Sequence, residues 1–211
     1  MGEDYNVEVK LLATTFLTSE GEKSFSKGPL SNGESIIEYA GRLCWDTQDK
    51  TGQTPNRIQE WIKVGHESMV EHSSATFYVR CSRVVTHELV RHRIASYSQR
   101  SQRYVKETEP RFITPPELAG NSTVGLLFIQ AMEQAWCAYG EFLKAGIKPE
   151  IARYVLPNAC ETQIVFTMNF RELRHFIRLR TSKQALPEMR CVAGKVRDIC
   201  KALAPQVFEE C

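Results

Sequence analysis

A strand that leads directly into a cluster of cations constrains this chain more than any other feature. Hydrophobic and polar residues alternate from Ser74 to Ser82, which predicts a strand with one face in the core. Seven Arg or Lys residues and one acid, Glu88, lie between Arg80 and Lys106, although the net charge of the whole chain is only +2. Cations interleaved with hydroxyl and amide side chains are what a phosphate-bearing ligand needs. The sequence therefore favours an anionic ligand at this place.

A surface that binds RNA is the alternative interpretation of the same cations. Two features argue against it. The cations follow an apolar strand and a half-apolar helix, and the rest of the chain has no matching basic excess. A small anion in a pocket explains this distribution better than a long polyanion on a surface, so we expect no nucleic-acid partner.

The remaining pattern predicts two more strands and several helices. Alternation predicts strands over Tyr5–Leu11 and Thr162–Met168. Apolar residues at helical spacing predict a long helix over Thr123–Ala145 and a last helix over Met189–Leu203. The chain contains no repeat, linker or low-complexity segment, so we expect one α+β domain over residues 1–211.

Shorter elements are predicted from their ends. A polar, Gly- and Ser-rich loop is expected over Gly21–Gly33. Thr54 is predicted to cap a helix with Pro55 in its first turn, and Gly65 to stop it. A short helix after Ser82 is expected to carry the Arg-His-Arg triplet of residues 91–93 at its C-terminal end.

Helical geometry singles out Arg180. Asn169, with Glu172 three residues on, is predicted to cap the helix that contains it. The apolar residues of this helix form one stripe, toward which Arg180 projects back. A guanidinium there needs an anionic or strongly polar partner, which is either a bound ligand or a carboxylate of the protein. The polar side opposite the stripe is predicted to carry Arg171, Arg174, His175 and Arg178.

Several classes of protein are excluded by what the sequence lacks. No apolar run approaches the length that crosses a bilayer, and the first ten residues are acidic and polar, so neither a membrane nor a signal peptide is expected. The seven cysteines are scattered and never form a C-x-x-C pair, which indicates reduced thiols in a cytoplasmic protein.

Motifs for metal and nucleotide binding are absent as well. His87 and His92 are five residues apart, which places them roughly 140° apart on a helix and prevents a shared zinc ion. No metal site is expected. The chain has no glycine-rich phosphate loop. Cys160 has no neighbour in sequence that would activate it, so a packed thiol is the better interpretation.

Four ordered segments resemble one known family. Arg91-His92-Arg93, seven residues, Ser101 and then Arg103-Tyr104 resemble the signature of flavin-dependent thymidylate synthases, the ThyX family. The resemblance covers roughly Ile36 to Phe208. The other matching segments are GHESMVEH (Gly65–His72), ARYVLPNA (Ala152–Ala159) and TMNFRELRHFIRLR (Thr167–Arg180).

The resemblance implies a fold, a reaction and an assembly. The fold would be a single domain with a mainly antiparallel sheet packed by long helices. The reaction would be reductive methylation of dUMP to dTMP, with FAD as cofactor, NADPH as reductant and 5,10-methylenetetrahydrofolate as carbon donor, which leaves tetrahydrofolate. The protein would be a homotetramer whose active sites lie between subunits.

The resemblance also implies roles for individual residues. Arg180 would sit against the uracil and stabilise negative charge on the ring, which activates carbon 5. Gln184 stands where many members of the family carry His. The residues that would contact FAD are Ser68, Arg91, His92, Arg93, Gln99, Asn169, Arg171 and His175. The residues that would contact dUMP are Glu88, Arg91, Gln99, Arg100, Ser101, Gln102, Arg103, Arg153 and Arg180.

The residue types agree with that chemistry. Transfer of a one-carbon unit to uracil requires electron density at carbon 5, which a cysteine can supply by covalent addition. An arginine can instead favour the N3-ionised ring while a reduced flavin supplies hydride. A guanidinium stays charged at any working pH, so it can stabilise an anion without titrating. The lack of an activated cysteine is then expected.

Overall fold

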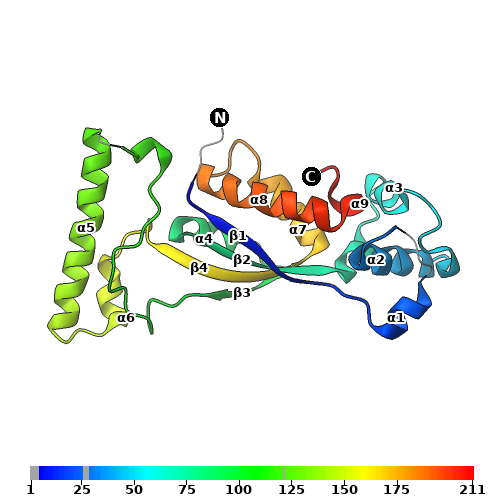
Figure 1. Ribbon diagram of the computed structural model, residues 1–211, viewed down its shortest axis with the longest axis horizontal. Helices are drawn as coiled ribbons and strands as arrows, with labels where there is room; N and C mark the ends of the chain where they lie inside the picture. The colour runs from blue at the N-terminus through cyan, green and yellow to red at the C-terminus, as the bar shows by residue number, and fades with distance from the viewer. Residues whose placement is uncertain (1–4, 26–28, 121) are drawn as a thin grey trace.

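A four-stranded antiparallel sheet forms the centre of the computed structural model, which describes residues 5–25, 29–120 and 122–211 (Figure 1). The strands are β1 (Glu8–Thr14), β2 (Ser74–Ser82), β3 (Ala95–Gln99) and β4 (Glu161–Asn169), in the order β1-β2-β4-β3. β2 and β4 pair from Ser74 opposite Asn169 to Ser82 opposite Glu161. The expected α+β fold with an antiparallel sheet is confirmed.

Helices cover one face of the sheet and lie at both of its ends (Figure 1). α4, α7 and α8 lie along one face, α1 to α3 gather at one end, and α5 and α6 lie at the other. The helices are α1 (Ser19–Ser24), α2 (Asn32–Leu43), α3 (Arg57–Lys63), α4 (Arg83–Leu89), α5 (Thr123–Lys144), α6 (Pro149–Ala152), α7 (Phe170–Arg180), α8 (Pro187–Leu203) and α9 (Pro205–Phe208). Short 3₁₀ turns are η1 (Gln48–Lys50), η2 (Ser68–His72), η3 (Pro116–Leu118) and η4 (Arg153–Val155).

The core lies between the sheet and the helices α7 and α8. Alternate residues of β2 and β4 are buried, and Phe77 stacks on Phe166 with 5.4 Å between ring centroids. Phe176 of α7 packs against the same ring. The opposite face of the two strands is only half-buried and carries Thr76 and Thr167, whose hydroxyl oxygens lie 2.9 Å apart. The alternation in the sequence thus marks which face the helices cover.

The predicted helix start at Thr54 is wrong. α3 begins at Arg57, and its cap is Asn56, which has a left-handed conformation with φ of 57° and makes no capping bond with its side chain. Thr54 instead accepts a hydrogen bond of 2.7 Å from Arg42 Nη2, which ties the loop to α2. The predicted stop is confirmed, since α3 ends two residues before Gly65, whose φ is 84°.

The loop predicted over residues 21–33 is shorter than expected. α1 extends into it from Ser19 to Ser24, and α2 begins at Asn32 behind the capping box of Ser31 and Glu34. Residues 26–28 of this loop lie outside the described residues.

The prediction that Arg174 faces away from the core is also wrong. Its side chain is buried and donates a hydrogen bond to the carbonyl oxygen of Val207. Burial lowers the pKa of this guanidinium. Val207 belongs to α9, a short helix that the sequence pattern did not predict, and α9 covers the side of α7 that was expected to face solvent.

The helix α5 is present as predicted, but part of its apolar surface is exposed. Met132, Trp136 and Tyr139 are buried, whereas Leu126 and Leu127 are exposed, Leu127 to 63%. α5 stands at one end of the molecule, apart from the helices that cover the sheet (Figure 1). Its exposed apolar face is unusual for a helix that packs only within its own chain.

Two further expectations concern the environment of the chain. None of the described helices combines the length and the apolar character needed to cross a bilayer. The seven cysteines all lie among the described residues, and none of them forms a disulfide.

Candidate active site

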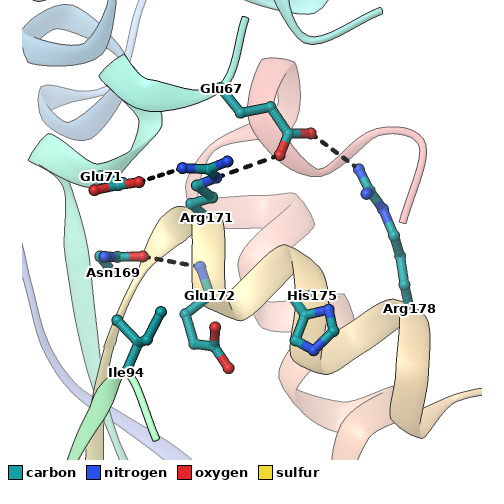
Figure 2. A pocket seen from close by; sticks show the side chains of 8 residues that line it. All are labelled: Glu67, Glu71, Ile94, Asn169, Arg171, Glu172, His175 and Arg178. Carbon is teal, nitrogen blue, oxygen red and sulfur yellow. Dashed lines mark hydrogen bonds and ion pairs between the residues drawn. The ribbon is translucent and has the colours of Figure 1, made fainter. Parts of the chain in front are cut away.

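A pocket lies at the N-terminal end of α7, where the strand β4 ends. The side chain of Asn169 accepts a hydrogen bond of 2.8 Å from the backbone nitrogen of Glu172, which confirms the predicted cap. The pocket has a volume of about 460 Å³, within the range of sites for small molecules. Figure 2 shows its lining, which consists of Glu67, Glu71, Ile94, Asn169, Arg171, Glu172, His175 and Arg178.

Two acids hold the cations of this pocket in place. Arg171 Nη1 lies 2.5 Å from Glu71 Oε1, and Arg178 Nη2 lies 3.4 Å from Glu67 Oε1 (Figure 2). The bond with Glu71 raises the pKa of Arg171. Glu67, Glu71 and Arg178 were not among the predicted site residues. The signal was present, since both acids belong to the GHESMVEH segment, but the sequence does not show that this segment packs against α7.

A partly buried chain of hydrogen bonds runs from Glu172 in α7 through His92 and Arg180 to Glu88 in α4. His92, which is 4% exposed, places Nδ1 2.8 Å from Glu172 Oε1. Its other ring nitrogen, Nε2, accepts a hydrogen bond of 3.2 Å from Arg180 Nε. Arg180 also donates to Glu88, through Nη1 to Oε2 at 2.7 Å and through Nη2 to the backbone oxygen at 3.1 Å. The sequence left open whether the partner of Arg180 is a bound ligand or a carboxylate of the protein. In this structure it is a carboxylate, that of Glu88.

Within the part of the protein that the structure describes, one group of side chains has the spacing of metal ligands. The ligand atoms of His92, Glu172 and His175 all lie within 4.8 Å of one another. Both ring nitrogens of His92 already have partners, however, in Glu172 and Arg180. A metal ion bound to His92 would have to break one of these hydrogen bonds, which argues against a metal site among these residues.

The Arg-His-Arg triplet follows the end of α4 rather than lying within it. The hydroxyl of Tyr97 lies 2.8 Å from the carbonyl oxygen of Leu89 and 2.7 Å from that of His92, so it shares its proton between the two. Burial raises the pKa of this hydroxyl. Tyr97 belongs to β3, which the sequence analysis did not predict. The triplet is therefore held by the strand that follows it, with the side chains of Arg91 and Arg93 exposed.

The predicted phosphate-binding residues lie at the other end of β3. Gln99 donates to the hydroxyl oxygens of Thr86 at 3.1 Å and Thr162 at 3.3 Å. The hydroxyl of Ser101 accepts a hydrogen bond of 3.1 Å from the backbone nitrogen of Arg103. These contacts fold residues 99–103 into a loop that the sheet edge supports.

Ion pairs connect this loop to the region around α6. Arg103 Nε lies 3.0 Å from Glu150 Oε2, and Arg100 pairs with Glu107. Arg153 Nε donates to the backbone oxygen of Glu150 at 3.2 Å. Arg103 and Arg153 thus share Glu150 as a partner, whereas Arg100 pairs with a different acid, Glu107.

Gln102 of this loop is buried, and so is Cys160. Burial is the main reason that the pKa of the Cys160 thiol is raised, to about 11. At neutral pH this cysteine is a protonated thiol and a poor nucleophile, which agrees with a packed residue.

The helix α4 connects two groups of residues. One is the Arg180 group, which consists of Glu88, His92, Glu172 and Arg180, and the other is the loop 99–103. With seven residues, α4 spans about 10 Å. At its first residue, Arg83 Nη2 donates to the backbone oxygen of Arg100 at 3.1 Å. Near its end, Glu88 binds Arg180. Arg83 was counted in the basic stretch but not predicted as a site residue. Within one chain, the predicted uracil contact and the predicted phosphate contacts therefore lie at opposite ends of this helix.

Ser68 lies outside both groups. It begins η2 and lines a separate small pocket with His66, Trp45 and Trp61. The same 3₁₀ turn carries Glu71 in the wall of the larger pocket. The turn η2 therefore contributes Ser68 to the small pocket and Glu71 to the larger pocket, which Asn169 also lines. Ser68 and Asn169 do not line the same pocket in this chain.

Comparisons with known proteins agree on one family. The sequence model of the family described as thymidylate synthase complementing protein matches residues 29–206. A flavin-dependent thymidylate synthase of Corynebacterium diphtheriae is 36% identical over 100% of this chain and 92% of its own length. Another from Clostridium tetani is 37% identical over 99% of this chain and 88% of its own length.

A solved structure resembles the whole fold. It is the UMP/dUMP methylase PolB from Streptomyces cacaoi bound with 5-Br dUMP, with a TM-score of 0.79 and 26% identity. The match covers 99% of this chain and 96% of that one.

Proposed function

The chain belongs to the flavin-dependent thymidylate synthase family, and from this premise we propose that it converts dUMP to dTMP by reductive methylation. It is an enzyme of this type, with FAD as the proposed cofactor. The proposed carbon donor is 5,10-methylenetetrahydrofolate and the proposed reductant is NADPH, so tetrahydrofolate is the second product. The observation that carries the proposal is the position of Arg180, which Glu88 and His92 hold at the C-terminal end of α7.

The residues around the α7 pocket fit a flavin dinucleotide. The N-terminus of α7 and the cation of Arg171 favour an anionic pyrophosphate. Glu67 and Glu71 now pair with the cations, so the bound anion would compete with these two carboxylates. When bound, FAD would supply the hydride for the nucleotide. The residues proposed to hold it are Ser68, Arg91, His92, Arg93, Gln99, Asn169, Arg171 and His175.

Arg180 is the proposed catalytic residue. A guanidinium has five N–H donors, and Arg180 uses three of them, one on His92 and two on Glu88. The two that remain could bind a uracil oxygen or the N3 anion, which would raise electron density at carbon 5. Arg180 carries its charge at any working pH, so the ring can be stabilised as an anion without a titrating group.

The loop 99–103 is the proposed phosphate site. Ser101 and Arg103 would bind the phosphate, and Arg100, Gln102 and Arg153 are proposed as further contacts of the nucleotide. Three charge-assisted hydrogen bonds at the upper end of the range of about 1.5–3 kcal/mol each would supply the roughly 8 kcal/mol that corresponds to micromolar affinity. Glu88, Arg91 and Gln99 are proposed to complete the nucleotide site together with Arg180.

We further propose a homotetramer in which one chain supplies the Arg180 group and another supplies the loop 99–103. Two observations support this proposal. The two groups lie at opposite ends of α4 in one chain, and the helix α5 presents an apolar face with Leu126 and Leu127 exposed. A second copy of the chain would cover that face and bring the two groups together.

The first test is the absorption spectrum of the purified protein. We expect a bound flavin and oxidation of NADPH that becomes faster when dUMP is added. A protein that stays colourless after FAD is supplied would contradict the proposal.

A second assay separates the possible substrates, since the similar solved protein is described as a methylase of UMP and dUMP. Release of tritium from labelled dUMP and labelled UMP, with methylenetetrahydrofolate present, shows which nucleotide is methylated. We expect dUMP to be methylated, and release from UMP alone would refute the assignment.

A further inference from the structure

We propose that Glu172 is a positioning residue, which holds His92 in its neutral form with the proton on Nδ1, so that the lone pair on Nε2 fixes Arg180. The inference rests on the proposed role of Arg180 but concerns residues that need not touch the nucleotide. It assigns a purpose to a carboxylate that none of the predicted contacts included.

The first step is the direction of the hydrogen bond between Arg180 and His92. A guanidinium has only donors. Nε2 of His92, at 3.2 Å from Arg180 Nε, must therefore be the acceptor and carries no proton. A neutral imidazole with a free Nε2 has its proton on Nδ1.

The second step is the partner of that proton. Nδ1 of His92 lies 2.8 Å from Glu172 Oε1, so the carboxylate accepts from it. Glu172 lies in the first turn of α7, where the helix dipole stabilises negative charge. The carboxylate and the guanidinium together select one tautomer, because each can act only in one direction.

The third step concerns the charge of the ring. The groups that face His92 are Glu172, His175 and Arg180 from α7, and Phe176 packs against the ring edge with 5.2 Å between centroids. Burial is the largest influence and lowers the pKa of His92, with Arg180 and His175 acting in the same direction and Glu172 opposing them. The neutral ring required by the hydrogen bonds is thus also the form that burial favours.

The consequence is that Glu172 controls Arg180 through His92. If the proton moved to Nε2, two donors would face each other and Arg180 would lose one of its three hydrogen bonds. Its guanidinium would then be held from the side of Glu88 alone. The predicted effect is on the orientation of the catalytic group and therefore on turnover, more than on the affinity for the nucleotide.

The tautomer can be measured directly by nitrogen NMR of the full-length protein labelled with ¹⁵N-histidine. His92→Asn identifies the signals of this residue among the five histidines. We expect a protonated Nδ1 and an unprotonated Nε2 at neutral pH, and the neutral ring to persist below the ordinary histidine pKa of about 6.5. A protonated Nε2, or an imidazolium at neutral pH, would overturn the inference.

Two substitutions connect the tautomer to turnover. In Glu172→Gln the amide oxygen can still accept from Nδ1, so we expect the same tautomer and most of the activity. Glu172→Leu removes the acceptor, and we expect kcat to fall by about tenfold, which corresponds to one lost hydrogen bond to a charged group, with a smaller change in the KM for dUMP.

Each outcome separates this inference from the proposed function. Retention of both the tautomer and full turnover in folded Glu172→Leu would overturn the role of Glu172. The NMR measurement on the unaltered protein needs no turnover, so it stands even if Glu172→Leu does not fold. It also stands if the protein turns out to methylate a different substrate.

Discussion

The arginines that lie near the two ends of α4 are held in different ways. At one end Arg180 is partly buried, and three hydrogen bonds to Glu88 and His92 fix its orientation. At the other end Arg103 is 56% exposed on its side chain and pairs with Glu150 on the surface. The first arrangement is suited to a group that must be positioned for chemistry. The second is suited to a group that attracts a phosphate and adapts to it.

The largest expected effect is at the buried end. Arg180→Ala should retain FAD and lose methylation by about 10²–10³-fold, the size seen when one preorganised donor to a developing anion is removed. The flavin spectrum and the release of tritium from labelled dUMP measure the two properties separately. Arg197→Ala is the matched control, because Arg197 lies on α8 and pairs with Asp198 at the surface. Near-normal turnover in Arg180→Ala would remove its assigned role.

The second prediction asks whether the two ends meet in an assembly. Leu127→Glu places a charge on the exposed apolar face of α5, so we expect a smaller oligomer and a large loss of activity. Light scattering after gel filtration measures the mass, and circular dichroism checks that α5 still forms. Gln130→Glu adds the same charge at an exposed polar position of the same helix and should change neither property. An unchanged mass in Leu127→Glu would show that this face is not the interface.

A smaller effect is expected at the exposed end. Ser101→Ala removes a hydroxyl that accepts from the backbone nitrogen of Arg103. We expect the KM for dUMP to rise by about five- to tenfold, equivalent to one hydrogen bond of about 1 kcal/mol, while kcat changes less. Steady-state kinetics with dUMP varied measure both constants. Loss of turnover with normal dUMP affinity would contradict a role of Ser101 in binding dUMP.

The smallest effect concerns the stability of the surface pair. Arg103→Ala should change the free energy of unfolding by less than about 1 kcal/mol, because exposed ion pairs contribute little. The same variant should weaken dUMP binding, and this loss should shrink as salt is added. Glu150→Gln is the control that removes the partner but keeps Arg103. A marked loss of stability in Arg103→Ala would show that the pair is structural.

The difference between the two ends also marks what sequence could predict. β2, β4 and the cap at Asn169 follow from alternation and from side-chain chemistry, which are local. The ionic partner of Arg180 was narrowed to a carboxylate or a ligand, but the sequence could not identify Glu88, which lies 92 residues away. Long-range pairing of polar groups leaves no periodic signal.

Polar residues that the fold buries were the main source of error. Arg174 was expected on the solvent side of α7, and only the packing of α9 shows that it is buried. β3 consists of small and polar residues, so its pattern lacks the apolar alternation that identifies the other strands. Apolar periodicity records which face meets the core. It does not record which polar residues a later segment will cover.

The short helix α4 has a consequence for an assembly of the proposed kind. If its two ends contribute to two different active sites, each α4 forms a rigid connection between neighbouring catalytic centres. A nucleotide that displaces the loop at Arg100 would move Arg83 at the start of α4. Because Glu88 lies near the end of the same helix, this movement would change the hydrogen bonds of Arg180 in the neighbouring centre. Communication between sites would be built into seven residues, and occupancy of one centre would tune its neighbour.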